Sequence, residues 1–218
     1  MRLSFLLDQN IQEFGEYPFL YYGEKKFTNV ETRAYANQLA IELQRSGIKK
    51  GDRVIVMMPN SPEVLIAYQA ITRAQAVIVP VLFTLHPKEI AYIAENCEAA
   101  RILSSSSIQG QVNQIEKELS TNIPIVMIDD LSDLTSPSVR VEENDGMHVP
   151  DFNDDEVAVI LYTSGTTGSP KGVMLTHRNL YKNAVNSSSH ANVERGSTIG
   201  ALPLAHVFGL TISHACYV

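Results

Sequence analysis

The stretch Tyr162–His177 reads Tyr-Thr-Ser-Gly-Thr-Thr-Gly-Ser-Pro-Lys-Gly-Val-Met-Leu-Thr-His, and it is the most specific pattern in the chain. The segment Thr163–Lys171 combines two glycines, several hydroxyl side chains and one lysine between two runs that alternate like strands. Glycine lets backbone N–H groups approach an anion closely, hydroxyls add hydrogen-bond donors, and Lys171 adds a mobile positive charge. The stretch therefore predicts a phosphate-binding loop that joins two strands.

A Walker A loop, G-x-x-x-x-G-K-[ST], is the obvious alternative, and two residues exclude it. Counted from Gly165, its second glycine falls at Pro170, which has no N–H to give a phosphate. Its final hydroxyl residue falls at Gly172, which has no side chain to bind Mg²⁺. The loop also leads into the apolar run Val173–Leu175 and not into a helix whose N-terminus could hold the anion.

The strand and helix signals before this loop alternate regularly. A hairpin is predicted over Phe19–Phe27, and Thr28-Asn29-Val30-Glu31 has the spacing of a capping box for a helix that Gly47 ends. The main strands are predicted at Arg53–Met58, Ala76–Leu82, Arg101–Ser104, Pro124–Ile128 and Glu156–Tyr162. The helices between them are predicted at about Pro62–Ala74, Pro87–Cys97 and Ile108–Leu119.

Strands separated by helices predict an α/β fold with a mainly parallel β-sheet that helices flank on both faces. The Phe19–Phe27 hairpin is expected on a different edge or layer. Asp129–Asp155 is interpreted as a surface excursion and not as a domain linker. A helix is expected over Thr176–His190, capped by His177, and another apolar helix opens near Phe208.

Composition limits the classes of partner. The 218 residues are 44% hydrophobic and 19% charged, as in globular proteins that bury a core. The net charge of −7 argues against a nucleic-acid partner, because no basic stripe is present. No apolar run reaches membrane-spanning length, and the N-terminal apolar run is too short for a signal peptide. We therefore expect a cytoplasmic protein without a transmembrane segment, compatible with peripheral association with a membrane.

No metal site is predicted within this chain. Cys97 and Cys216 lie far apart without C-x-x-C spacing, which indicates two buried free thiols in a reducing compartment. The acidic pair Asp154 and Asp155 is interpreted as part of a solvated charge run, because no ligand spacing accompanies it. Ser104–Ser107 is expected to be a loop and not a row of nucleophiles, since no His or Asp partner is indicated nearby.

The loop and its surroundings resemble the signature of the adenylate-forming superfamily, which comprises acyl-CoA synthetases, peptide-synthetase adenylation domains and luciferases. Tyr162–Gly172 followed by Val-Met-Leu-Thr-His-Arg-Asn-Leu looks closest to its fatty acyl-CoA ligases. Gly51–Val54 together with Met58–Glu63 resembles the "GDRV…PNSPE" segment of the family. Leu202–Leu210 resembles its Pro-Leu-x-His-x-x-Gly segment. The likeness covers nearly the whole chain.

This resemblance implies an enzyme that joins a carboxylic acid, expected to be a fatty acid, to ATP and then passes the acyl group to coenzyme A, with Mg²⁺ assisting. The residues that it assigns to the triphosphate and the departing pyrophosphate are Thr163, Ser164, Gly165, Thr166, Thr167, Gly168 and Lys171. It assigns His206 to the substrate pocket, beside the acyl carboxylate or in the wall of the acyl tunnel. His86 and His148 receive no functional assignment.

The resemblance also implies that residues 1–218 are the incomplete N-terminal, large domain of such a ligase, without its C-terminal domain. The expected adenine, ribose and Mg²⁺ contacts and the C-terminal lysine are not found in this sequence. The isolated chain is therefore expected to be inactive. An exposed apolar patch is expected near its end, formed by Leu210, Ile212, Cys216, Tyr217 and Val218.

Two other functions stay open. The first is that of a related adenylating enzyme without CoA transfer, either an acyl-AMP ligase or an amino-acid adenylation domain. Thr166 and the His206 segment favour the ligase over the amino-acid branch, in which serine is commoner at the position of Thr166. The second is that of a short, non-catalytic module that binds a nucleotide or an acyl group. Termination inside an apolar helix weighs against such a module.

Overall fold

The computed structural model describes residues 3–129, 153–163, 170–191 and 197–215. Its strands are β1 (Pro18–Tyr22), β2 (Lys25–Thr28), β3 (Arg53–Val56), β4 (Val77–Pro80), β5 (Ala99–Ser104), β6 (Ile125–Met127), β7 (Val157–Thr163) and β8 (Lys171–Thr176). Its α-helices are α1 (Leu6–Phe14), α2 (Asn29–Arg45), α3 (Pro62–Arg73), α4 (Pro87–Asn96), α5 (Gln109–Glu118), α6 (His177–Ala191) and α7 (Val207–Ala215). Two short 3₁₀ helices are η1 (Leu3–Phe5) and η2 (Ser106–Ile108).

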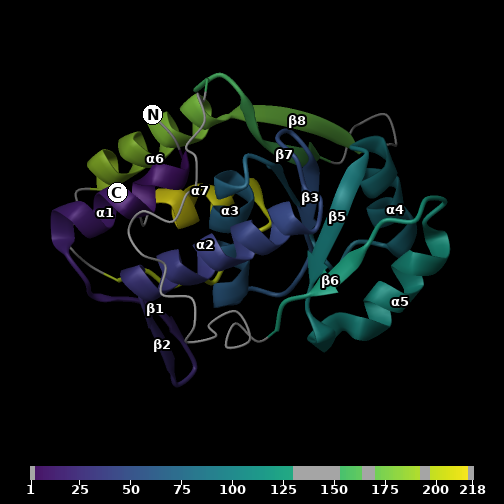
Figure 1. Ribbon diagram of the computed structural model, residues 1–218, viewed down its shortest axis with the longest axis horizontal. Coiled ribbons are helices and arrows are strands. Elements are labelled where there is room, and N and C mark those ends of the chain that lie inside the picture. Colours follow the sequence, from purple (N-terminus) through teal and green to yellow (C-terminus); the bar gives the residue numbers. More distant parts are fainter. Residues whose placement is uncertain (1–2, 130–152, 164–169, 192–196, 216–218) are drawn as a thin grey trace.

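Six strands form one sheet in the order β6-β5-β3-β4-β7-β8, and β1 and β2 form a separate antiparallel hairpin (Figure 1). Neighbours in the large sheet are parallel, except β7 and β8, which are antiparallel. The predicted α/β fold class with its mainly parallel sheet is therefore confirmed, and so is the separate layer of the hairpin. The five predicted strands are all present, with ends that differ by a few residues.

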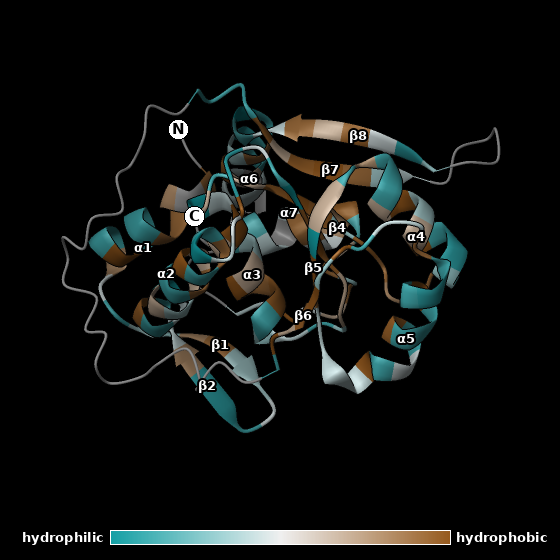
Figure 2. Ribbon diagram, turned by 45° about the vertical axis from the view of Figure 1, so that its right-hand side comes forward, coloured by the Kyte–Doolittle hydropathy of each residue, from teal (hydrophilic) through white to brown (hydrophobic). Residues whose placement is uncertain are grey.

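Each face of the sheet has its own hydrophobic core. In β3, Val54 and Val56 pack into one core with α2 and α3, while Ile55 and the following Met57 pack into the other with α4. This alternation follows from the two-residue period of a strand. Figure 1 shows α4 and α5 together on one side of the sheet, and Figure 2 shows apolar strands inside more hydrophilic helices. The central strands are therefore positioned from both sides.

The start of α2 matches its sequence signal. The Glu31 N–H donates to the Thr28 hydroxyl at 3.0 Å, and the Thr28 N–H donates to the Glu31 carboxylate at 2.7 Å. This reciprocal pair is the predicted capping box, which satisfies two N–H groups that a helix start leaves without partners. After the helix, Gly47 takes a φ of 95°, a left-handed value that glycine adopts readily.

The C-terminal helix corrects one expectation. Leu210 is buried in the core that also contains Leu180 and Ala184 of α6, so it is not part of an exposed patch. The side chain of Ile212 and residues 216–218 lie outside the described part of the chain. None of the described helices is both long and apolar enough to cross a membrane.

His214 of α7 makes the stability of this packing depend on pH. Burial lowers the pKa of its imidazole to about 4, against a smaller opposing effect of its 2.7 Å hydrogen bond from Nδ1 to the Leu210 carbonyl. An unfolded histidine has a pKa of about 6.5. The unfolded chain therefore takes up the proton first as the pH falls. The contribution of His214 to native stability is complete above about pH 6.5 and is lost progressively toward about pH 4.

We expect His214→Gln to reduce the loss of unfolding free energy between about pH 7.5 and about pH 5 by about 2 kcal/mol. Urea denaturation of both proteins at the two pH values measures this difference. The control is Gln114→Ala on the exposed face of α5, which removes no ionisable group and should leave the pH dependence unchanged. A loss of equal size in wild type and His214→Gln would contradict the assignment.

Candidate functional site

The glycine- and hydroxyl-rich stretch is carried by the β7–β8 hairpin. Thr163, the last residue of β7, pairs directly with Lys171, the first residue of β8, and both are exposed at the tip. The two strands predicted on either side of the loop are therefore confirmed, and they pair antiparallel. Five of the predicted phosphate-binding residues lie within residues 164–169, outside the described part of the chain: Ser164, Gly165, Thr166, Thr167 and Gly168.

The base of the loop is anchored by Tyr162. A Cβ on its cross-strand partner Gly172 would lie 2.9 Å from Ile160 Cγ2 and 3.2 Å from the Tyr162 ring, so these side chains would have to shift to admit any other residue. The Tyr162 hydroxyl donates to Asn96 Oδ1 at 2.5 Å. Burial raises the pKa of Tyr162 to about 12, so the phenol keeps the proton that it donates. Tyr162 thereby ties the hairpin to the end of α4.

Lys171 provides positive charge at the tip. Its side chain is exposed, and no carboxylate of the described residues lies within ion-pair distance of it. An ammonium group on a flexible stem can follow a mobile polyanion and contact several of its oxygens in turn. The arrangement of Lys171 opposite Thr163 therefore fits a phosphate-bearing ligand.

His206 lies at the start of α7 and caps it. The Phe208 N–H donates to His206 Nδ1 at 3.4 Å, and the His206 N–H donates to the Pro203 carbonyl at 3.0 Å. Because Nδ1 accepts a hydrogen bond, the neutral ring carries its proton on Nε2. The exposed ring therefore offers Nε2–H as a donor. Three exposed apolar side chains lie on the same segment, Leu202, Val207 and Phe208.

Two residues that the sequence analysis did not select hold this segment. Asn60 Nδ2 donates to the Leu202 carbonyl at 2.7 Å and to the Gly200 carbonyl at 3.1 Å, and Asn60 Oδ1 accepts the Leu204 N–H at 2.9 Å. The Tyr68 hydroxyl donates to the Leu204 carbonyl at 3.2 Å. Asn60 lies in the "PNSPE" segment, where the pattern indicated only a helix start. Nothing in the sequence indicated its partners.

The structure does not bring all the candidate residues together. Among the described residues, no side-chain hydrogen bond or ion pair joins Thr163 or Lys171 to His206. The tip of the β7–β8 hairpin and α7 occupy separate places in both Figure 1 and Figure 2. The described part of the chain therefore contains two separate regions of candidate function, one at the hairpin tip and one at the start of α7.

One sequence expectation near these regions is wrong, and another gains a partner that was not expected. Thr176 and not His177 caps α6, because the Asn179 N–H donates to the Thr176 hydroxyl at 3.2 Å and Asn179 Oδ1 accepts the Thr176 N–H at 3.0 Å. His177, the first residue of that helix, is buried. The Ser104–Ser107 loop does have an acidic partner. The Ser105 hydroxyl and the Ser106 N–H donate to Asp129 Oδ1 at 2.6 and 2.9 Å, and Ser105 itself caps η2 by accepting the Ser107 N–H at 3.2 Å.

The acidic run shows ion pairing where it is described. The Arg178 guanidinium contacts both carboxylate oxygens of Asp155, at 2.8 and 3.0 Å. Within residues 3–129, 153–163, 170–191 and 197–215, no group of three or more His, Cys, Asp or Glu side chains is placed to hold a metal ion.

Comparisons with known proteins agree on one family. A sequence profile described as "AMP-binding enzyme" matches residues 7–218. The long-chain-fatty-acid–CoA ligase of Bacillus subtilis is 28% identical over 96% of this chain and 43% of its own length. A linear gramicidin synthase of Brevibacillus parabrevis is 28% identical over 88% of this chain and 2% of its own length. The chain thus spans less than half of either relative.

The fold also matches a solved structure. The crystal structure of a long-chain-fatty-acid–CoA ligase from Archaeoglobus fulgidus superposes with a TM-score of 0.84 and 24% identity. The superposition covers 100% of this chain and 45% of that protein. At this level of identity the match establishes the fold.

The start of α7 gives a second testable prediction. A Cβ on the buried Gly209 would lie 2.2 Å from the Pro203 carbonyl oxygen, so the backbone must shift to accommodate any side chain there. We expect Gly209→Ala to lower the free energy of unfolding by about 1–3 kcal/mol, measured by urea denaturation. The control is Gly110→Ala in α5, where nothing lies within 4 Å of the added Cβ. Equal stability of the two variants would disprove the steric requirement.

Proposed function

Because this chain belongs to the AMP-binding enzyme family, we propose that it is part of the N-terminal, large domain of an AMP-forming acyl-CoA ligase. In the proposed reaction a carboxylate oxygen attacks the α-phosphorus of ATP, and the bond to pyrophosphate breaks. The acyl-adenylate then transfers its acyl group to the thiol of coenzyme A and releases AMP. The observation that carries the proposal is the pairing of Lys171 directly opposite Thr163 at the tip of the β7–β8 hairpin, on either side of the glycine- and hydroxyl-rich stretch.

The hairpin would act mainly through electrostatics and positioning. The first step places negative charge on a crowded α-phosphate and on the departing pyrophosphate, and donors fixed around these oxygens stabilise that charge. Lys171 supplies the positive charge, and the loop supplies hydroxyl and backbone N–H donors. The residues to which we assign this role are Thr163, Ser164, Gly165, Thr166, Thr167, Gly168 and Lys171.

The start of α7 would form part of the acid-binding pocket. A neutral His206 with its proton on Nε2 can donate a hydrogen bond to a carboxylate oxygen, and Val207 and Phe208 present apolar surface beside it. Apolar surface next to a group that donates a hydrogen bond to the substrate carboxylate fits a fatty acid better than a small polar acid. The name of the Bacillus subtilis relative supports the same substrate class.

Other parts of the reaction are proposed to lie beyond residues 1–218. The chain covers 43% of the Bacillus subtilis ligase, and we place the adenine and ribose contacts, the Mg²⁺-associated acidic residue and a C-terminal lysine in the remainder. Bound Mg²⁺ would neutralise phosphate charge during adenylation. We assign no residue of this chain to Mg²⁺ or to coenzyme A, and we propose a cytoplasmic location.

A second candidate is adenylation without CoA transfer, by an acyl-AMP ligase or an amino-acid adenylation domain. The similarity to the linear gramicidin synthase supports this candidate, because that relative is 28% identical to the chain, the same value as for the Bacillus subtilis ligase. A thioester assay on the complete protein, with a panel of fatty, aromatic and amino acids, separates the two candidates. Adenylate without thioester for every acid would favour the second. A non-catalytic binding module would give neither product.

The roles of Lys171 and His206 predict opposite substrate effects in the full-length enzyme. We expect Lys171→Ala to lower kcat/KM for ATP by about tenfold to a hundredfold, since a charge-assisted hydrogen bond contributes about 1.5–3 kcal/mol, and to leave the preference among acids unchanged. His206→Ala should lower kcat/KM for the acid more than that for ATP. Steady-state kinetics with each substrate varied in turn measures both.

The matched control for Lys171 is Lys182, an exposed lysine on α6, whose substitution by Ala should change neither parameter. If Lys171→Ala and His206→Ala gave the same profile for both substrates, the division of roles would be wrong. If Lys182→Ala weakened ATP use as much as Lys171→Ala, the effect would reflect overall charge and not the loop.

The isolated 218-residue chain should not form acyl-CoA and should bind ATP weakly. The proposed loop donors are present, but the adenine and ribose contacts are assigned to residues outside this chain. The free-energy cost of ordering the loop around a hydrated anion is therefore not offset by other contacts. Isothermal titration with ATP and a thioester assay on a preparation free of host ligases test this. Turnover of acid, ATP and coenzyme A by the purified chain would falsify it.

A further inference from the structure

The backbone of Leu204 is hydrogen-bonded through both its N–H and its carbonyl to side chains from the segment that follows β3. Its N–H donates to Asn60 Oδ1 at 2.9 Å, and its carbonyl accepts the Tyr68 hydroxyl at 3.2 Å. Asn60 Nδ2 also donates to the carbonyls of Leu202 and Gly200. We call these four hydrogen bonds the Leu204 clamp. They join residues that are 136 to 144 positions apart in the sequence.

The Asn60 side chain bonds this segment as the backbone of a neighbouring strand would. An amide group presents an acceptor and a donor side by side, as a peptide does. Asn60 can therefore bond the N–H of Leu204 and the carbonyl of Leu202 at once. Aspartate would lack the donors, and alanine would lack both functions. The geometry thus requires an amide at this position.

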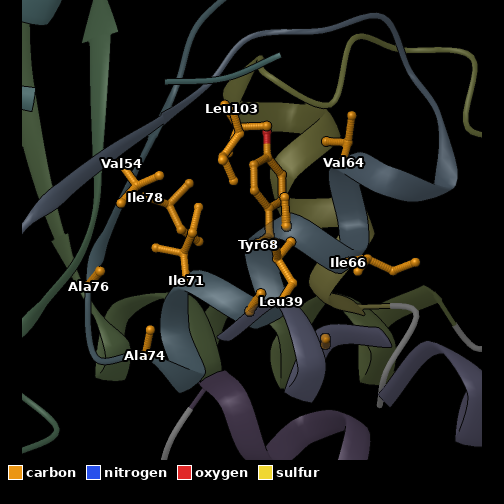
Figure 3. Close-up of a cluster of buried hydrophobic side chains, with 14 of the residues drawn as sticks. Leu39, Val54, Val64, Ile66, Tyr68, Ile71, Ala74, Ala76, Ile78 and Leu103 are labelled. Carbon is orange, nitrogen blue, oxygen red and sulfur yellow. The ribbon is translucent and has the colours of Figure 1, made fainter. Parts of the chain in front are cut away.

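The base of the clamp is rigid. Asn60 follows β3, which lies between β5 and β4 in the sheet, at the carboxyl end of the strand. Tyr68 is buried in α3, and Figure 3 shows it with Leu39, Ile71 and Leu103 of the same core around it. The segment that it holds has no regular structure from Ser197 to His206 and is largely exposed. The clamp therefore fixes an irregular segment against residues that the core holds in place.

His206 depends on this segment. Its N–H is bonded to the Pro203 carbonyl, and Pro203 immediately precedes the clamped Leu204. Displacement of Leu204 would move the turn that orients the His206 ring and the start of α7. We propose that Asn60 and Tyr68 are positioning residues for the acid-binding pocket, which they support through His206 without contacting the acid. This inference rests on the function proposed above for His206.

The first test needs no activity. In the full-length enzyme, Asn60→Ala should increase hydrogen exchange of the amides within residues 200–210 by about tenfold, because loss of the clamp makes local opening easier. Asn29→Ala is the matched control, since Asn29 also makes several hydrogen bonds, to Asn10, Gly15 and Tyr17, near the other end of the chain. Unchanged exchange in residues 200–210 of Asn60→Ala would overturn the clamp. Should Asn60→Ala not fold, Tyr68→Phe, which loses one hydrogen bond, replaces it.

The second test separates positioning from general destabilisation. Asn60→Ala should lower kcat/KM for the acid by about tenfold and change the KM for ATP by less than about twofold, whereas Asn29→Ala should change neither. In a His206→Ala background the additional effect of Asn60→Ala on the acid should disappear. Fully additive effects of the two substitutions would overturn the positioning role.

The outcomes also separate this inference from the function proposed for His206. If His206→Ala leaves the acid kinetics unchanged, the assignment of His206 fails, whatever Asn60→Ala does. If His206→Ala weakens use of the acid, and Asn60→Ala increases exchange without affecting the acid, only the positioning role fails.

Discussion

Burial of the parallel sheet on both faces is the constraint on which the rest of this structure depends. Strand β3 has neighbours on both sides and a hydrophobic core on each face, so its position is fixed in every direction. A parallel sheet also requires crossover helices, and these supply the two cores. Asn60 lies four residues after the end of β3, and Tyr68 lies in α3, the next helix. The residues that hold the His206 segment are therefore themselves held in place by this core.

The sequence predicted the parts of the fold that local patterns determine. The capping box at Thr28 and Glu31 and the hairpin near Gly23 each depend on a few adjacent residues, and both are present. The apolar run at Ala76–Leu82 correctly predicted a buried strand, because burial on both faces removes polar residues from such a run. The alternation of strands and helices extended this to the fold class, and the likeness to adenylate-forming enzymes extended it to the family.

Two of the misread features, Leu210 and Asp129, share a physical cause, which is long-range contact, whereas the cap of α6 was misassigned by a single position. Leu210 was expected to be exposed because apolar residues follow one another closely there, but α6 covers it. Asp129 was not recognised as the partner of Ser105, because the two are separated by 24 positions and meet only when β5 and β6 pair. The role of Asn60 depends on contacts with residues near position 200, which no local pattern contains. The residues at the centre of the loop lie outside the described part of the chain, so their assignment stays a prediction.

The long sequence separation within the Leu204 clamp also has a consequence for folding order. Contacts between residues more than a hundred positions apart form late, because the chain entropy lost in closing such a loop must be offset by structure already in place. Asn60 and Tyr68 acquire fixed positions only when β3 and α3 have packed. The segment that carries His206 can therefore dock only on a core that has already formed. A substitution that displaces β3 or α3 would therefore also displace the segment that carries His206, although that segment lies more than a hundred positions away in the sequence.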